Sequence, residues 1–427
     1  MDNVRLLLFM ALAFIGMLIY QAWQQDYGPG TQIAAPQPVQ PSTVYGEMPD
    51  APQRADIDNA MPDLPGEATP SAEATARLIE VRTDTLELAI DTRGGTIVDA
   101  RLNQYPVAVD QPDVKYRLLS QRPSDFFIAQ SGLLGADKER TPTHEVLFNA
   151  DAQRYELAEG EDELIVDLHW QSEDGVKVTK RYTFTRGTHA VQLEHLVTND
   201  SDSLWIGREY RQLQRGEPAD SGNVFMYTYT GGAIYSQEDK YQKYDFEDLG
   251  AGKLDRDVID GWIAMIQHYF LGAIIPPRGE QQHFYGKRLA NGRAVIGAYT
   301  PAKRIEPGSS AKFTGVMFLG PKLQAELEQL AQGLDLTVDY GWLVFIAKPM
   351  YWVLEQIYSL VHNWGWTIII FTILIKLAFF KLSETSYRSM ANMRKLTPRI
   401  QALKDRYGDD KQRMQQAMME MYKTEKI

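Results

Sequence analysis

The sequence contains no cysteine in its 427 residues. This absence excludes disulfide bonds, thiolate metal ligands and a cysteine nucleophile in this chain. Its seven histidines form no H-E-x-x-H pair, and LGAGKL (249–254) is not a phosphate loop, because Glu247 stands where the first glycine is needed. Ser309 and Lys312 have the spacing of a Ser–Lys dyad, but a turn is the simpler interpretation. We therefore expect no catalytic residue, no metal site and no cofactor.

Positive charge is scarce over most of the chain, and the net charge is −12. This balance disfavours a general affinity for nucleic acid. The distribution is uneven, since residues 24–340 hold 30 Lys/Arg against 48 Asp/Glu, whereas residues 381–427 hold 11 against 6. The acidic central part and the basic C-terminal part therefore need separate explanations.

Two apolar runs are long enough to cross a bilayer, at residues 6–23 and 364–380. The first predicts an uncleaved membrane anchor within residues 1–26, because the run is long and no A-x-A site follows it; a removed signal peptide is the alternative. Arg5 precedes the first run, and eleven basic residues follow the second. Since basic flanks stay in the cytoplasm, both ends are expected there, with the acidic stretch between them exported.

Residues 27–76 are rich in Pro, Ala, Gln and Ser, which predicts a disordered tether. From residue 77 onward apolar and polar positions alternate, as in LIEVRTDTLELAIDTRGGTIVDARL, where the turn at 93–96 (RGGT) indicates a hairpin. Because such segments recur with turn residues between them, residues 77–335 are predicted to form a large antiparallel β-sandwich. A helix at 322–333 is expected to close it.

The next segment, residues 341–362, predicts an amphipathic helix. Its polar face carries Lys348, Glu355, Ser359 and His362, and its other face is aromatic and aliphatic. This pattern favours a helix lying in the outer membrane–water interface. A full span is the alternative, but it would export the basic C-terminal part, against the charge rule.

The second apolar run predicts a transmembrane helix at 364–382 that contains Lys376. A charge within a bilayer costs at least ~2.5 kcal/mol, so this lysine is a candidate functional residue. Lys376 shares a helical face with Thr372, one turn earlier. The alternative is a simple anchor, because its long stem can carry the ammonium to the nearby cytoplasmic interface.

Residues 383–427 predict a cytoplasmic hairpin of two helices. Thr397-Pro398 is expected to begin the first helix, and Leu403 lies in its apolar seam. Gly408 and Asp409 are expected to separate the helices, and Met414 and Met418 lie on one face of the second. The methionines fill gaps in that seam or form a pliable surface for varied apolar segments.

The first part of this predicted hairpin is also basic. Four basic residues lie within 388–399 and suit anionic lipid headgroups or ribosomal RNA. A solvated flank that only obeys the charge rule is the alternative. The sequence leaves both interpretations open.

Several strings together resemble the YidC membrane-protein insertases. They are NWGWTIIIFTILIKLAFFKLSETSYRSMANMRKLTPRIQALKDRYGDDKQRMQQAMMEMYKTEK, DLTVDYGWLVFIAKPM, DGWIAMIQHYF, GGAIYS with KYQKYDF, and LELAIDTRGGTIVDARL. The strings GDDKQR and DLTVDYGWL are specific. The resemblance covers essentially the whole chain, in the form typical of Gram-negative inner membranes.

This resemblance implies a non-enzymatic insertase and chaperone. Its substrates would be nascent inner-membrane proteins, and its partners the Sec translocon, the ribosome and the phospholipid bilayer. It implies a mutarotase-like periplasmic sandwich and a helical core whose hydrophilic groove carries one cation, which aligns with Lys376. The family usually has Arg there and Pro where this chain has Lys381. It also continues with four further core spans beyond Ile427, so this chain is expected to be a fragment or part of a larger protein.

A second function remains open from the residues alone. An exported carbohydrate-binding or carbohydrate-modifying sandwich, held by two anchors, would need a carboxylate or histidine pair that converges in a cleft of residues 77–335. The sequence singles out no such pair. Glycan binding by this domain would favour that alternative.

Overall fold

The structure is a computed structural model that describes residues 76–427 apart from 136, 218–228, 408–410 and 425–427. The predictions of an anchor in residues 1–26 and of a tether up to residue 75 lie outside the described residues. So do Gly408 and Asp409, the predicted break in the hairpin.

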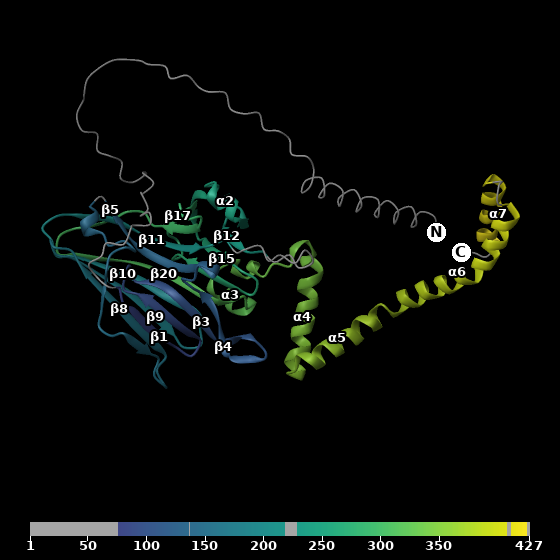
Figure 1. The fold of residues 1–427 in the computed structure, drawn as a ribbon, viewed down its shortest axis with the longest axis horizontal. Coiled ribbons are helices and arrows are strands. Elements are labelled where there is room, and N and C mark those ends of the chain that lie inside the picture. Colours follow the sequence, from purple (N-terminus) through teal and green to yellow (C-terminus); the bar gives the residue numbers. More distant parts are fainter. Residues whose placement is uncertain (1–75, 136, 218–228, 408–410, 425–427) are drawn as a thin grey trace, which may run out of the picture. The chain divides into compact units, whose positions relative to one another are not determined.

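Two β-sheets make up the described part of residues 78–321 (Figure 1). The larger has the spatial order β14 (Asp255–Ile259), β17 (Gln281–Arg288), β18 (Ala294–Tyr299), β11 (Trp205–Arg215), β5 (Phe127–Gly135), β3 (Thr96–Ala108), β2 (Leu86–Asp91), β1 (Leu78–Arg82), β7 (Arg154–Glu156), with β19 (Lys303–Ile305) beside β11 and β4 (Gln111–Leu119) beside β3. The smaller has the order β13 (Lys240–Tyr244), β12 (Gly231–Ser236), β15 (Trp262–Ile266), β16 (Phe270–Ile275), β20 (Ser309–Pro321), β10 (Ala190–Asn199), β9 (Val176–Thr185), β8 (Glu163–Gln171), β6 (Asn149–Ala150). Among these described strands only β1 and β7 pair in parallel.

The sheets pack face to face, and several of their strands, such as β2 and β9, alternate between buried and more exposed residues, whereas central strands such as β11 and β15 are buried along nearly their whole length. In β2 the residues Leu86, Leu88 and Ile90 are buried, while those between them are half-buried. Strands with this period of two bury one face against a second sheet. The prediction of a large antiparallel β-sandwich is therefore confirmed.

The predicted hairpin at 93–96 joins β2 to β3. Gly94 and Gly95 there have φ of +67° and +60°, a region that side chains other than glycine rarely adopt. A Cβ on Gly94 would also collide with the backbone of His144. The turn thus needs glycine for conformation and for space.

Charged side chains lie between the sheets as well. Lys180 on β9, His195 on β10, and Glu209 and Arg211 on β11 are each at most 2% exposed. Arg211 donates two hydrogen bonds to Glu209, of 3.0 Å and 2.5 Å, and Nδ1 of His195 lies 2.7 Å from Oε1 of Glu209. Burial lowers the pKa of His195, so we expect a neutral imidazole that donates to the carboxylate.

Helices follow the sandwich. They are α3 (Gln324–Leu330), the short 3-10 turns η3 (Leu334–Thr337) and η4 (Gly341–Leu343), α4 (Val344–Val361), α5 (Trp364–Ala378), α6 (Phe380–Tyr407) and α7 (Lys411–Thr424), and a short α2 (Phe246–Gly250) lies earlier, beside β17. Two further 3-10 turns, η1 (Pro123–Asp125) and η2 (Lys138–Arg140), flank β5.

Two helical predictions differ from the structure. The helix expected at 364–382 is divided at Phe379, and α5 and the first part of α6 are bent by 57°. In the described part of the chain no single helix is long and apolar enough to cross a membrane, whereas this bent pair passes that test by length and composition. The prediction that Thr397-Pro398 begins a helix is wrong, because α6 runs through Pro398. Proline there removes only one helical hydrogen bond, and the turns on both sides maintain the helix.

Candidate functional site

The first candidate site lies on helix α5, which meets α4 at a sharp corner. His362 ends α4 in the left-handed conformation, with φ of +51°, and its N–H donates to the carbonyl of Tyr358 at 2.7 Å. Asn363 caps α5, since its side-chain oxygen accepts from the N–H of Trp366 at 3.2 Å. The Trp364 ring stacks on that of Tyr358, with centroids 4.4 Å apart. These contacts fix how α5 leaves α4.

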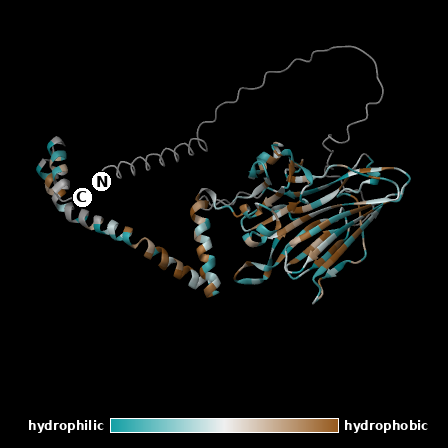
Figure 2. Ribbon diagram, turned by 180° about the vertical axis from the view of Figure 1, so that it is seen from behind, coloured by the Kyte–Doolittle hydropathy of each residue, from teal (hydrophilic) through white to brown (hydrophobic). Residues whose placement is uncertain are grey.

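Helix α5 is apolar along most of its length, as the brown colouring in Figure 2 shows. Two of its polar side chains satisfy themselves within the helix. The hydroxyl of Thr367 donates to the carbonyl of Asn363 at 2.9 Å, and that of Thr372 donates to the carbonyl of Ile368 at 2.7 Å. Such bonds let a threonine lie in apolar surroundings without an outside partner.

Lys376 is the charged side chain of α5, and it lies in the last turn of that helix. It is exposed and makes no hydrogen bond or ion pair with any residue that the structure describes. A cation is favoured at this end of a helix, where the carbonyl oxygens point outward. Thr372 and Lys376 therefore differ. The hydroxyl of Thr372 already donates a hydrogen bond to its own helix, whereas the ammonium of Lys376 is available to a group outside the described chain.

The break at Phe379 adds to this arrangement. It follows Lys376 by three residues, so the ammonium projects from the joint between α5 and α6 rather than from the middle of a long helix. Exposed aliphatic side chains surround the joint, among them Ile373, Leu374 and Leu377. The joint thus combines one cation with an apolar surface.

The hairpin residues beyond the joint are placed only in part. Helices α6 and α7 are in contact with each other. Leu403 on α6 and Met414 on α7 are both half-buried. The side chain of Met418 lies outside the described residues. The seam that the sequence predicts stays a prediction for these positions.

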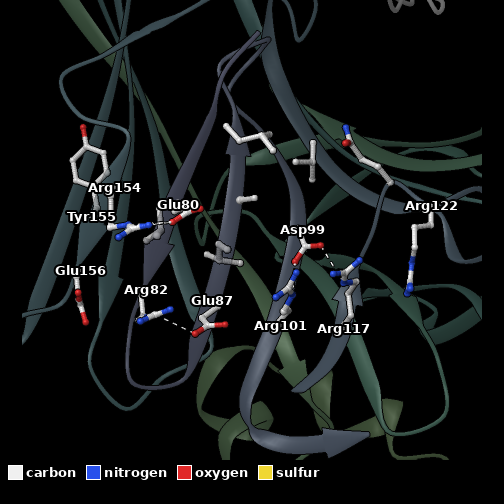
Figure 3. Close-up of a pocket in the computed structure, with 16 residues that line it drawn as sticks. Glu80, Arg82, Glu87, Asp99, Arg101, Arg117, Arg122, Arg154, Tyr155 and Glu156 are labelled. Carbon is white, nitrogen blue, oxygen red and sulfur yellow. Dashed lines mark hydrogen bonds and ion pairs between the residues drawn. The ribbon is translucent and has the colours of Figure 1, made fainter. Parts of the chain in front are cut away.

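A second candidate is a hollow of about 580 Å³ on the larger sheet (Figure 3). Several of its charged side chains form ion pairs, within one strand or between strands. Asp99 on β3 accepts from Arg101 and Arg117, each at 3.1 Å. Glu87 on β2 lies 2.6 Å from Lys115 and pairs with Arg82 as well. Two carboxylates of the hollow, Asp99 and Glu87, are therefore already paired with cations.

These pairings bear on acid–base chemistry. Burial alone would raise the pKa of Glu87, but its hydrogen bond with Lys115 and the nearby arginines lower it. Glu87 thus stays ionised and is unsuited to act as a general acid.

A neighbouring hollow of about 350 Å³ contains His144, whose pKa burial lowers to about 4. The imidazole is therefore neutral near pH 7, and its Nδ1 is already hydrogen-bonded to the hydroxyl of Tyr210, 2.5 Å away.

No group of three His, Cys, Asp or Glu side chains among the described residues is arranged to hold a metal ion.

The residues that sequence reasoning missed are the arginines of the hollow and the buried charges between the sheets. The sequence did contain a signal for one of the buried charges, Lys180. In β9 the inward positions run Val176, Val178, Lys180, Tyr182, Phe184, so strict alternation already directs the lysine inward.

Comparisons with known proteins give two family matches. The YidC periplasmic domain family matches residues 78–353, and the 60Kd inner membrane protein family matches residues 356–427. A membrane protein insertase YidC from Thioalkalivibrio sulfidiphilus is 47% identical over 439 residues, covering all of this chain and 78% of the relative. The YidC insertase of Methylococcus capsulatus is also 47% identical, over 429 residues, covering all of this chain and 77% of the relative.

Solved structures resemble the sandwich more remotely. A galactose mutarotase-like protein from Lactobacillus casei matches 57% of this chain and 99% of its own, at 10% identity and a TM-score of 0.39. A putative aldose 1-epimerase from Escherichia coli K12 matches 57% and 99%, at 9% identity and a TM-score of 0.33. The mutarotase-like description of the sandwich stays a prediction.

Proposed function

Because this chain belongs to the YidC family of membrane protein insertases, we propose that Lys376 is the cation that receives polar or acidic segments of nascent membrane proteins as they enter the bilayer. The family membership confirms the resemblance seen in the sequence. The role of the lysine is the one that the resemblance implies, and the unpaired ammonium at the α5–α6 joint supports it.

The physical problem of insertion is the transfer of polar groups through hydrocarbon. An amide or hydroxyl without a partner costs roughly 2–7 kcal/mol to transfer, and an ion costs far more. A fixed cation near the end of the apolar helix offers such groups a partner part of the way across. Because water screens poorly there, its attraction for a carboxylate exceeds that in bulk solvent. No covalent bond is made or broken in this role.

The self-satisfied threonines of α5 support this assignment. The hydroxyls of Thr367 and Thr372 donate to carbonyls of their own helix, so their protons are not available to a substrate. The charge of Lys376 is therefore the feature of α5 that distinguishes one substrate segment from another. Acidic segments should depend on it most.

We also propose the arrangement and the partners. The N-terminus and the α6–α7 hairpin lie in the cytoplasm, the sandwich in the periplasm, and α4 in the interface between periplasm and membrane. The basic excess of residues 381–427 suits the ribosome or the cytoplasmic lipid surface. Cooperation with the Sec translocon rests on family membership alone.

The test replaces Lys376 in the full-length protein and measures insertion in cells depleted of their own insertase. Lys376→Arg should retain insertion, because the charge stays. Lys376→Ala should impair it, mainly for substrates with acidic exported segments, and Lys376→Glu should impair it further by repulsion. Substrates whose exported segments lack acidic residues are expected to change less.

The matched control is Lys381→Ala. It removes the same charge from the exposed face of α6, on the other side of the joint. If Lys381→Ala and Lys376→Ala reduce insertion equally, the effect follows total basic charge and the proposal is wrong. If Lys376→Glu inserts acidic substrates normally, Lys376 is only a snorkelling anchor.

A further inference from the structure

The hairpin of β3 and β4 extends beyond the sheet that carries it (Figure 1). Pairing of β2 with β3 ends at Leu86 and Leu102, whereas β3 and β4 stay paired out to Ala108 and Gln111. The outer part of β3 thus pairs with β4 alone and forms a two-stranded ribbon, in which Pro106 lies opposite Lys115 and Ala108 opposite Gln111, with register shifts between these pairs. A ribbon of this kind is marginally stable in water unless something holds it.

Aromatic contacts hold the base of the ribbon to the smaller sheet. Tyr116 on β4 stacks on Phe270 at the start of β16, with ring centroids 4.1 Å apart. Tyr105 on β3 meets the same ring edge-on at 5.6 Å. The base is therefore fixed, and the outer part of the ribbon projects from it.

The tip of the ribbon exposes aliphatic side chains. Val109 is 98% exposed, and Val107 and Val114 are each about half exposed. Val109 is also the first residue of the two-residue turn, and its φ is not positive, so the backbone there makes no special demand on the type of residue. Its side chain is left open to an apolar surface outside the chain.

The tip lies at the end of the sandwich from which the chain continues toward α4. Tyr269, next to the Phe270 that holds the ribbon, is exposed, and its carbonyl accepts from the N–H of Lys322 at 2.8 Å. The ammonium of Lys322 in turn donates to the carbonyl of Thr337 in η3. Lys348 of α4 lies 3.8 Å from Asp335 in the same turn. A chain of direct contacts therefore links the base of the ribbon to α4.

Charge behind the tip favours an anionic surface. Glu87 and Asp99 each face two cations, Arg82 with Lys115 and Arg101 with Arg117, at 2.6–3.1 Å. Four cations thus meet two carboxylates, although the whole chain is acidic. A hollow of about 740 Å³ beside the ribbon is lined by Val107 and Val114 and by more basic than acidic side chains. The basic ones are Arg101, Lys115, Arg117, Arg122 and Arg215, and the acidic ones are Glu87, Asp113 and Asp125. Apolar and cationic lining together suit a phospholipid headgroup with the start of its acyl chains.

We propose that the tip of the β3–β4 ribbon rests in the interfacial layer of the phospholipid bilayer and is a lipid contact of the sandwich in addition to α4. The bilayer is the apolar phase that an inner-membrane family member always adjoins. Asp110 and Asp113 at the tip keep it at headgroup depth, because carboxylates are costly in the hydrocarbon core. The contact would set the height and tilt of the sandwich above the membrane.

The test uses the absence of cysteine. Val109→Cys, labelled with an environment-sensitive fluorophore, is reconstituted as the full chain in nanodiscs of phosphatidylethanolamine and phosphatidylglycerol. The fluorophore should show blue-shifted emission, and lipids brominated near the carbonyl end should quench it severalfold more than lipids brominated near the terminal methyl. The control is Glu173→Cys, an exposed position in the turn between β8 and β9 at the opposite end of the strands. It should show neither effect.

Each other outcome contradicts the proposal. Emission typical of water at position 109 means that the tip is free in solution. A blue shift without quenching by brominated lipid means that the tip touches protein instead. Two double variants test whether apolar contact holds the tip. Val107→Asn combined with Val109→Cys should lose most of the quenching. Ile165→Asn combined with Val109→Cys, in which the exposed apolar residue of β8 is changed instead, should retain it. Equal quenching in both would show that apolar contact does not hold the tip.

Discussion

The ammonium of Lys180, on β9 of the smaller sheet, donates a 2.6 Å hydrogen bond to the carbonyl oxygen of Gly94, in the turn that joins β2 to β3 of the larger sheet. It also donates to the carbonyl of Ser131 at 3.1 Å. One fully buried side chain therefore connects the smaller sheet to a turn and to strand β5 of the larger sheet. Lysine is almost never buried without such partners.

This lysine makes stability depend on pH. Burial lowers the pKa of Lys180 to about 7, although Glu209 opposes the effect. Between that value and the ~10.4 of an unfolded chain, the unfolded state binds a proton that the folded state lacks. The free energy of unfolding should therefore rise with pH, by up to about 1.4 kcal/mol per pH unit above pH ~7. Lys180→Met should remove this rise.

The measurement is the urea midpoint of the sandwich in the detergent-solubilised chain, at several pH values above and below 7. Lys177→Met serves as the control, because Lys177 is exposed on the same strand and pairs with Asp200 at 2.8 Å. It should keep the pH dependence of the wild type. An identical pH profile for both variants would show that Lys180 is not the titrating group.

Gly315 on β20 makes room for Arg211. A Cβ at that position would overlap the guanidinium and displace it from Glu209. Gly315→Ala should therefore destabilise the sandwich by about 3 kcal/mol, since breaking a buried ion pair costs roughly 3–5 kcal/mol. Glycine-to-alanine changes within strands ordinarily stabilise slightly, so the sign of the effect is diagnostic. Gly216→Ala, which meets only ordinary contacts with Phe126, should change the unfolding midpoint little.

Replacing Leu403 tests whether α6 and α7 form a packed hairpin. Its half-buried side chain lies on α6, which contacts α7. If Leu403 lies in the predicted seam, Leu403→Asp places a charge there and should open the hairpin, raising protease cleavage near residue 408 and weakening insertion. Membrane integration should stay normal, because the apolar runs are unchanged. The control is Tyr387→Asp, since Tyr387 is 72% exposed on the same helix. Unchanged cleavage in Leu403→Asp would contradict a packed hairpin.

The proposed topology predicts opposite labelling of two single thiols. Glu173→Cys lies on the sandwich, and Met419→Cys is well exposed on α7. In spheroplasts a membrane-impermeant maleimide should label position 173 at once, and position 419 only after the membrane is opened. Labelling of both from the same side would refute the arrangement of sandwich and hairpin on opposite faces.

The sequence anticipated the elements whose pattern is local. Period-two alternation identified the sandwich strands, and the glycine pair at 94–95 identified their hairpin. The predicted helices at 322–333 and 341–362 correspond to α3 (Gln324–Leu330) and α4 (Val344–Val361). Helix ends were less predictable. Pro398 lies within α6, and no glycine or proline marks the break at Phe379.

The sequence by itself determined where the alternating strands lie and that a cation follows Thr372 by one turn in an apolar run. The alternation in β9 also directs Lys180 inward, although its burial was not predicted. Only the tertiary structure decided what those groups meet. Arg211 and Gly315 come from strands of different sheets, and the projection of Val109 depends on where pairing with β2 ends. Periodicity is a property of neighbouring residues, whereas partners and exposure depend on contacts between segments far apart in the chain, which a single sequence does not encode in any local pattern.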